Sequence, residues 1–159
     1  IIYMCFINCK RIGHDIMALY FQTNVNRSDI FMNDKVHFAF PESEDKMAGP
    51  DIIREVRTNS KSVPIRIRKS YIMVDDKYGS MYTGFWSDMQ FEEKMQMFRE
   101  DLNYMKSLLD RGALVCFFIG NWTDILYDME KKSPKLMSAM RDETSEIFDL
   151  YPPKDIRTL

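Results

Sequence analysis

The chain has 159 residues and a formal net charge of −2, with 45% hydrophobic and 29% charged residues. This composition excludes a disordered, a fibrous and a disulfide-dense protein, because such chains are far more polar, repetitive or cysteine-rich. The length is typical of one domain, so we expect residues 1–159 to form a single α+β domain. The first residue is Ile1 rather than Met, which fits a domain cut from a longer protein.

Residue usage indicates the cellular setting. No apolar run reaches the roughly 20 residues of a membrane span, so we expect no membrane association. The 3 cysteines form no disulfide framework, and with 13 methionines they favour a reducing, intracellular compartment, cytoplasmic or nuclear. Glycosylation-type triplets beginning at Asn26 and Asn121 leave secretion as the alternative. Scarce Gly and Ala beside plentiful Ile, Lys and Phe are typical of AT-rich coding sequence, which favours a viral or invertebrate source.

The first third of the chain is predicted to be β structure. Apolar runs at 2–7 and 16–21 flank a short loop that contains glycine, which predicts a hairpin covered on both sides. Residues 36–40 alternate between apolar and polar side chains, which is typical of a half-buried strand, and Pro41 is expected to end it.

The middle of the chain begins with a short helix from Pro50, because proline suits the first helical turn. Residues 63–68 alternate with period two and predict another strand. The clearest hairpin spans 71–86, where a polar turn that ends in Gly79 separates runs rich in aromatic and β-branched residues.

A long helix is predicted over 87–111. Ser87 and Gln90 have the spacing of a capping box, and Gly112 is a typical C-terminal stop. One apolar stripe at helical spacing comprises Met95, Phe98, Leu102, Met105 and Leu109. These methionines are more typical of a core face than of an adaptable binding groove.

The end of the chain contains an apolar strand at 113–119 and helices at 123–132 and 134–148, the last with Ser133 as its cap. We therefore predict a mixed, largely antiparallel sheet of five or six strands, with one long helix and two C-terminal helices packed on it.

The basic stretch from 54 to 69 carries six cations and one acid, a local charge of +5. As a strand it would hold Arg66 and Arg68 about 7 Å apart on one face, near the spacing of successive phosphates. Tyr71 could add a stacking surface for bases. The predicted nucleic-acid-binding residues are Arg54, Arg57, Lys61, Arg66, Arg68, Lys69 and Tyr71. The alternatives are an acidic protein partner, or a solvated sheet face paired with acids of the long helix.

Acidic residues near the predicted strand ends suggest a catalytic alternative. Paired carboxylates can hold Mg²⁺ or Mn²⁺ for phosphodiester hydrolysis. The candidates are Glu42, Glu44, Asp51 and Asp75. An Asp-Asp pair beside Lys and Gly is also the composition of an ordinary turn.

The segment Tyr71-Ile72-Met73-Val74-Asp75-Asp76 through Gly84-Phe85, followed by a long helix, resembles the hairpin and helix of the Schlafen-like fold, an RNA-cleaving family. The resemblance covers residues 71–109 and implies a metal-dependent RNA nuclease. The chain lacks the Gly-Gly pair before the strand and the upstream Glu-x-x-x-x-Glu-x-Lys motif. Its nearest acids, Glu42 and Glu44, have a different spacing, so we do not assign the chain to this family.

Our leading hypothesis is a non-catalytic binding module of a larger viral or RNA-processing assembly, without metal or cofactor. It would contact RNA, or an acidic partner, through the basic strand region. The nuclease is one alternative. The other is a purely structural interaction domain that docks on a protein partner through helix 87–111 or the sheet.

Overall fold

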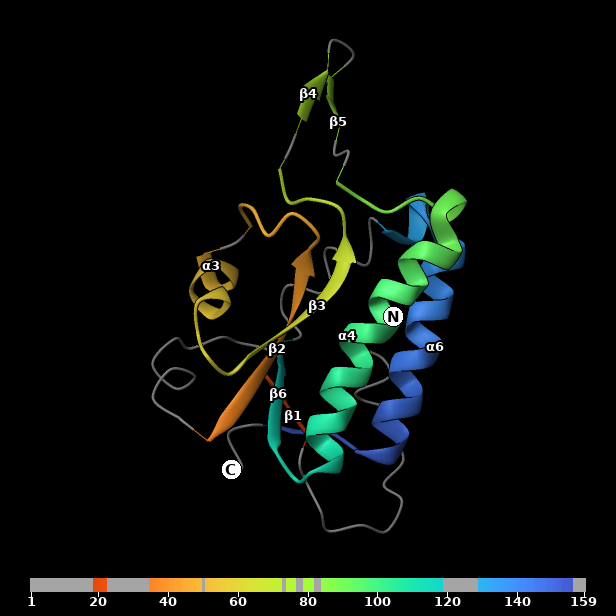
Figure 1. Cartoon of the computed structure of the whole chain (residues 1–159). Coiled ribbons are helices and arrows are strands. Elements are labelled where there is room, and N and C mark those ends of the chain that lie inside the picture. Colours follow the sequence, from red (N-terminus) through yellow and green to blue (C-terminus); the bar gives the residue numbers. More distant parts are fainter. Residues whose placement is uncertain are drawn as a thin grey trace.

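A computed structural model describes residues 19–22, 35–49, 51–72, 74–76, 79–81, 84–118 and 129–155. Its elements, in chain order (Figure 1), are β1 (Leu19–Gln22), β2 (Val36–Ser43), α3 (Asp51–Arg57), β3 (Ser62–Arg68), β4 (Val74–Asp76), β5 (Gly79–Met81), the 3-10 helix η1 (Asp88–Gln90), α4 (Phe91–Asp110), β6 (Leu114–Phe118), α6 (Pro134–Leu150) and β7 (Lys154–Asp155). The predicted strand at 2–7 lies outside the described residues, as does most of the helix predicted at 123–132.

The main sheet has the strand order β3-β2-β6-β1-β7, and every pair in it is parallel. The prediction of a largely antiparallel sheet is therefore wrong. Period-two alternation indicates which face a side chain occupies but not the direction of the neighbouring strand. Here α3 connects β2 to β3 and α4 lies between β3 and β6, and such helical crossovers return the chain in parallel. The antiparallel pair β4–β5 forms a separate two-stranded sheet.

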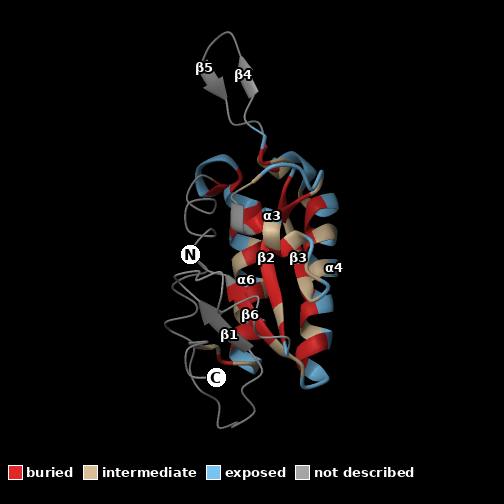
Figure 2. Ribbon diagram, turned by 90° about the vertical axis from the view of Figure 1, so that its left-hand side faces the viewer, coloured by how far each residue is buried: buried red, intermediate tan, exposed pale blue. Residues whose placement is uncertain are grey.

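Strand β2 differs from its prediction in both burial and length. It runs through Pro41 to Ser43, and seven of its eight residues are buried. The reason is that α3 lies on one side of the β2–β3 pair, while α4 and α6 lie on the other (Figure 1). A parallel strand between two helical layers is covered on both faces, as the buried colouring of β2 in Figure 2 shows.

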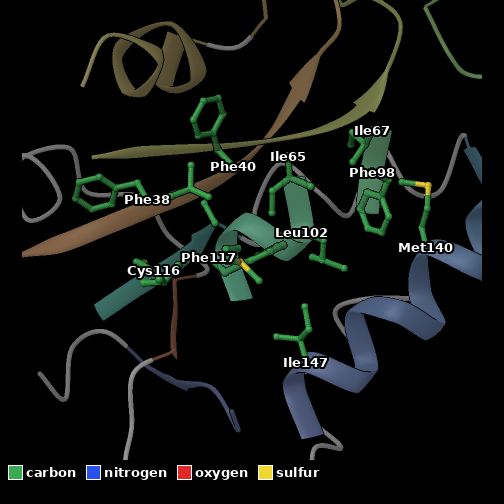
Figure 3. Close-up of a cluster of buried hydrophobic side chains, with 14 of the residues drawn as sticks. Phe38, Phe40, Ile65, Ile67, Phe98, Leu102, Cys116, Phe117, Met140 and Ile147 are labelled. Atoms are coloured by element: carbon green, nitrogen blue, oxygen red, sulfur yellow. The ribbon is translucent and has the colours of Figure 1, made fainter. Parts of the chain in front are cut away.

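The apolar stripe predicted for the long helix is confirmed as core. Met95, Phe98 and Met105 are fully buried, and Leu102 and Leu109 are at most 3% exposed. Figure 3 shows Phe98 and Leu102 facing the β3 side chains Ile65 and Ile67. A partner that docked on α4 would therefore meet its charged outer face and neither Met95 nor Met105.

The start of α6 is organised by residues that lie far away in the sequence. Pro134 opens the helix as predicted, but the hydroxyl of Ser133 does not cap it and donates to the carbonyl of Trp86. The Asp88 carboxylate replaces that cap, because it accepts from the backbone N–H of Lys135 at 3.0 Å and of Leu136 at 2.8 Å. Helix η1 is thereby attached to the N-terminus of α6. None of the described helices is long and apolar enough to cross a bilayer.

The C-terminal ends of α4 and α6 are joined by a hydrogen bond from the Tyr151 hydroxyl to Asp110 Oδ1, at 2.5 Å. This bond raises the pKa of Tyr151 to about 12. Since the unfolded chain loses that proton near pH 10, the folded chain binds more protons between pH 10 and 12, and its stability should fall across this window.

We expect an absorbance titration at 295 nm to report the ionisation of Tyr151. The difference between the wild-type protein and Tyr151→Phe should contain one transition near pH 12. A difference transition near pH 10 would mean that the hydrogen bond does not persist in solution.

Candidate functional site

The carboxyl ends of β2 and β3 hold the densest group of buried polar side chains in the described part of the chain. In parallel sheets this edge is where ligand and partner sites usually form. The group, here called the carboxyl-end cluster, comprises Glu42, Glu44, Arg57, Arg68, Tyr71, Trp86 and Lys94.

Glu42 and Arg57 form a bidentate ion pair. The Arg57 Nε and Nη2 atoms lie 2.7 Å from the two carboxylate oxygens of Glu42, whose side chain is only 1% exposed. Glu42 also accepts a hydrogen bond from the backbone N–H of Ser43 at 2.8 Å. Its hydrogen bonds to Arg57 raise the pKa of the guanidinium. Both charges are thus satisfied within the protein, and the pair attaches α3 to the end of β2.

Glu44 and Lys94 form a second pair, between the end of β2 and the first turns of α4. Lys94 Nζ lies 2.7 Å from Glu44 Oε1 and 5.9 Å from the centre of the Trp86 ring. The Lys94 side chain is 8% exposed, so its charge is compensated by a carboxylate and by the face of an aromatic ring.

Arg68 holds together the two chain segments that lead into and out of the β4–β5 hairpin. Its guanidinium lies over the rings of Tyr71 and Phe85, at 4.3 and 4.7 Å from their centres. Its Nε donates to the carbonyl of Ser70 at 2.9 Å, and the residue is 1% exposed. Arg68 therefore stabilises the base of the hairpin from inside.

Backbone hydrogen bonds complete this base. The Gly84 carbonyl accepts from the N–H groups of Lys69 at 2.7 Å and Ser70 at 3.1 Å. The Tyr71 hydroxyl donates to the carbonyl of Pro41 at 2.7 Å, which ties the base to β2. We call this arrangement the hairpin clamp, formed by Arg68, Lys69, Ser70, Tyr71, Gly84 and Phe85.

The other predicted nucleic-acid-binding residues are dispersed. Arg66 lies 2.8 Å from Asp101 and 3.2 Å from Glu100 on α4, so it takes part in an ion-pair network with that helix. Arg54 and Lys69 are exposed, and Lys61 precedes β3 at the opposite end of the strand. Arg66, Arg68 and Lys69 differ in their surroundings, because Arg66 is paired with α4, Arg68 is 1% exposed and Lys69 is exposed.

The four candidate metal ligands are spread over three parts of the chain. Glu42 lies in β2 and Glu44 directly follows that strand, and both have cationic partners. Asp51 begins α3, and Asp75 pairs with Ser80 in the hairpin. Within the described ranges no three His, Cys, Asp or Glu side chains gather as a metal site would require. The carboxylates of Glu42 and Glu44 form ion pairs in this fold.

Sequence reasoning missed three residues that build the carboxyl-end region: Gly84, Asp88 and Lys94. The chain has only 6 glycines, so a glycine directly before Phe85-Trp86 was a signal of close backbone contact. No local pattern identifies Asp88 as the cap of a helix that begins 46 residues later, or Lys94 as the partner of Glu44, because both contacts are tertiary.

Comparison with protein-family models, with curated proteins and with solved structures found no match to this chain. Its function must therefore be argued from the geometry.

Proposed function

We propose that the chain is a non-catalytic binding module of a larger assembly, and that it contacts a protein partner through the β4–β5 hairpin and the surface at its base. The observation that supports this proposal is a projecting hairpin whose base is held by hydrogen bonds and ring contacts. In Figure 1, β4 and β5 extend away from the carboxyl ends of β2 and β3, while the hairpin clamp fixes the segments that carry them.

The hairpin is short and pairs with itself. Its register joins Val74 to Met81, Asp75 to Ser80 and Asp76 to Gly79. An isolated two-stranded hairpin is only marginally stable in water, and its outer edges offer backbone groups to another chain. Exposed apolar side chains flank its base, with Ile72 40% and Met47 56% exposed. These features suit a protein surface that adds contacts to the hairpin.

Charge favours a protein over RNA as the partner. Arg57 and Arg66 are paired with carboxylates and Arg68 is buried against aromatic rings, so three of the six cations of this stretch already have partners within the protein. RNA contact through this stretch remains a prediction that relies mainly on Arg54 and Lys69, which are both exposed. An intracellular location is part of the proposal, since Cys116 is a free thiol.

Removal of the hairpin tests the proposal. Ser70 and Gly84, on the two sides of the hairpin base, are hydrogen-bonded to each other. A Gly-Ser-Gly linker is therefore a suitable replacement for residues 73–83. We expect this variant to keep the far-ultraviolet circular dichroism of the sheet and helices, with a melting temperature within about 4 °C of the wild type. A photo-crosslinking amino acid at Tyr78 should identify the partner, and the purified partner should then bind the shortened chain at least about tenfold more weakly.

The matched control carries the crosslinker at Tyr104, which is 51% exposed on α4. Equal binding of the purified partner to the wild type and to the shortened chain would contradict the proposal. Tight retention of the wild type on single-stranded RNA, lost on Arg54→Glu with Lys69→Glu, would favour the RNA alternative instead. The earlier candidates Arg66 and Arg68 are unsuitable for that test, because both support the fold.

A further inference from the structure

Strand β3 forms one edge of the main sheet, beside α4 (Figure 2), and in the described sheet its neighbour is β2. The edge of a sheet exposes a row of backbone N–H and C=O groups, and such a row is a template for pairing with another chain. Among the described strands the opposite edge is much shorter, because β7 comprises Lys154–Asp155. The edge of β3 is therefore the one at which strand addition has to be considered.

Backbone groups alternate in direction along β3. The carbonyl of Lys61, the residue before the strand, accepts from the N–H of Phe38 in β2 at 2.9 Å. The pairing of the two strands is regular as far as Arg66. In a regular ladder every second residue faces the neighbouring strand. Ser62, Pro64 and Arg66 therefore direct their backbone nitrogens outward, away from β2.

No N–H group is left for a second strand at these three positions. The Ser62 N–H donates to the carbonyl of Asn59 at 3.1 Å. Pro64 has no N–H, and proline within a strand is confined to edges such as this one. The Arg66 N–H donates to Asp101 Oδ2 at 2.8 Å. An incoming strand would find no backbone donor on this side of β3 between 62 and 66.

The side chain of Arg66 holds Asp101 in this position. Asp101 Oδ2 also accepts from Arg66 Nε at 2.8 Å, and Oδ1 accepts from Nη2 at 3.1 Å. These hydrogen bonds raise the pKa of the guanidinium. The Asp101 side chain is 18% exposed, whereas Glu100, which lies 3.2 Å from Arg66 Nη2, is 59% exposed. Of these two carboxylates of α4, Asp101 is thus the one that reaches the backbone of β3.

We propose that Asp101 and Pro64 close the β3 edge against one partner, the same edge of a second copy of this chain. The strand has the composition of one that associates with itself, because Val63, Ile65 and Ile67 are β-branched. Proline and charged groups beside such side chains are the usual means of blocking that association. Two identical edges can pair about a twofold axis, since the same groups then meet in both copies. The proposal does not involve the hairpin and is independent of the protein-binding function.

Sedimentation velocity of the complete chain over a range of concentrations tests the proposal. Asp101→Ala with Pro64→Val releases the Arg66 N–H and adds an N–H at position 64. We expect the apparent mass of this double variant to rise with concentration toward twice that of the monomer, beyond any rise in the wild type. Circular dichroism verifies that the variant is folded.

Two matched variants separate the edge from the ion pair. Asp101→Asn with Pro64→Val keeps an oxygen that can accept from the Arg66 N–H, although its amide nitrogen then faces Nη2. It should associate at least about tenfold more weakly than the double variant with alanine. Glu100→Ala with Pro64→Val removes the other carboxylate beside Arg66 and should associate no more than Pro64→Val alone.

Hydrogen exchange of the Arg66 amide locates the association and also tests the wild type, in case Asp101→Ala does not fold. In the wild type this amide should exchange at least about tenfold more slowly than in the unfolded chain. In the double variant with alanine it should exchange fast in dilute samples and slowly in concentrated ones. The proposal is overturned if the wild-type amide is unprotected, or if the folded double variant gains no mass over the wild type. It is also overturned if mass rises without protection of Arg66, or if the asparagine variant associates as tightly as the alanine variant.

Discussion

Replacement of Gly84 by alanine should lower the free energy of unfolding by about 3 kcal/mol or more, as measured by urea denaturation. A β-carbon at this position would lie 1.9 Å from the carbonyl oxygen of Ser70. The β-carbon would overlap a backbone atom, so one of the two chain segments of the hairpin clamp would have to move to remove the overlap. That movement would break the hydrogen bonds from Lys69 and Ser70 to the Gly84 carbonyl.

Gly112→Ala is the matched control. Gly112 has φ +81° and its added β-carbon would meet no atom within 4 Å, so the substitution adds backbone strain without overlap. Its cost should be about 1 kcal/mol. Equal costs for the two substitutions would show that the close approach of Gly84 to Ser70 does not exist. Gly84→Ala should also weaken binding of the partner, because the hairpin clamp orients the hairpin.

Local elements of this fold were accessible from the sequence for physical reasons. The apolar stripe of α4 and its end at Gly112 depend on residues three or four positions apart. The alternation of β3 depends on the period of two residues in a strand. The direction of the neighbouring strands could not be predicted, because Pro41 and the alternating run of β2 are compatible with both parallel and antiparallel pairing. The second buried face of β2 follows from α3. Ile53 and Val56 of that helix are buried, but their spacing does not indicate which strand they cover.

At the candidate site, too, local features could be predicted from the sequence and tertiary contacts could not. The high positive charge between 54 and 69 is real in the sequence, but a count of charges omits the carboxylates that other elements bring to it. Asp101 is 35 residues from Arg66, and Glu42 is 15 residues from Arg57. Arg68 in turn appeared to be a surface cation because its neighbours Tyr71 and Phe85 come together only through the hairpin.

The Glu42–Arg57 pair carries the second large prediction. Glu42→Gln should lower the free energy of unfolding by about 3 kcal/mol, because a buried carboxylate is removed while Arg57 stays in place. The glutamine Oε1 can still accept from the Ser43 N–H and from Arg57 Nη2, but its amide nitrogen then faces Arg57 Nε, and two donors cannot bond to each other. Urea denaturation at neutral pH measures the loss.

Glu100→Gln is the matched control, because it removes a carboxylate from an exposed ion pair instead of a buried one. Glu100 also pairs with an arginine, Arg66, but its side chain is 59% exposed, so the cost should be no more than about 0.5 kcal/mol. The double variant Glu42→Met with Arg57→Met should be more stable than Glu42→Gln alone, since no charge is then left without its partner. If Glu42→Gln and Glu100→Gln cost the same, Glu42 is solvated in solution, and the end of β2 is more open than this fold implies.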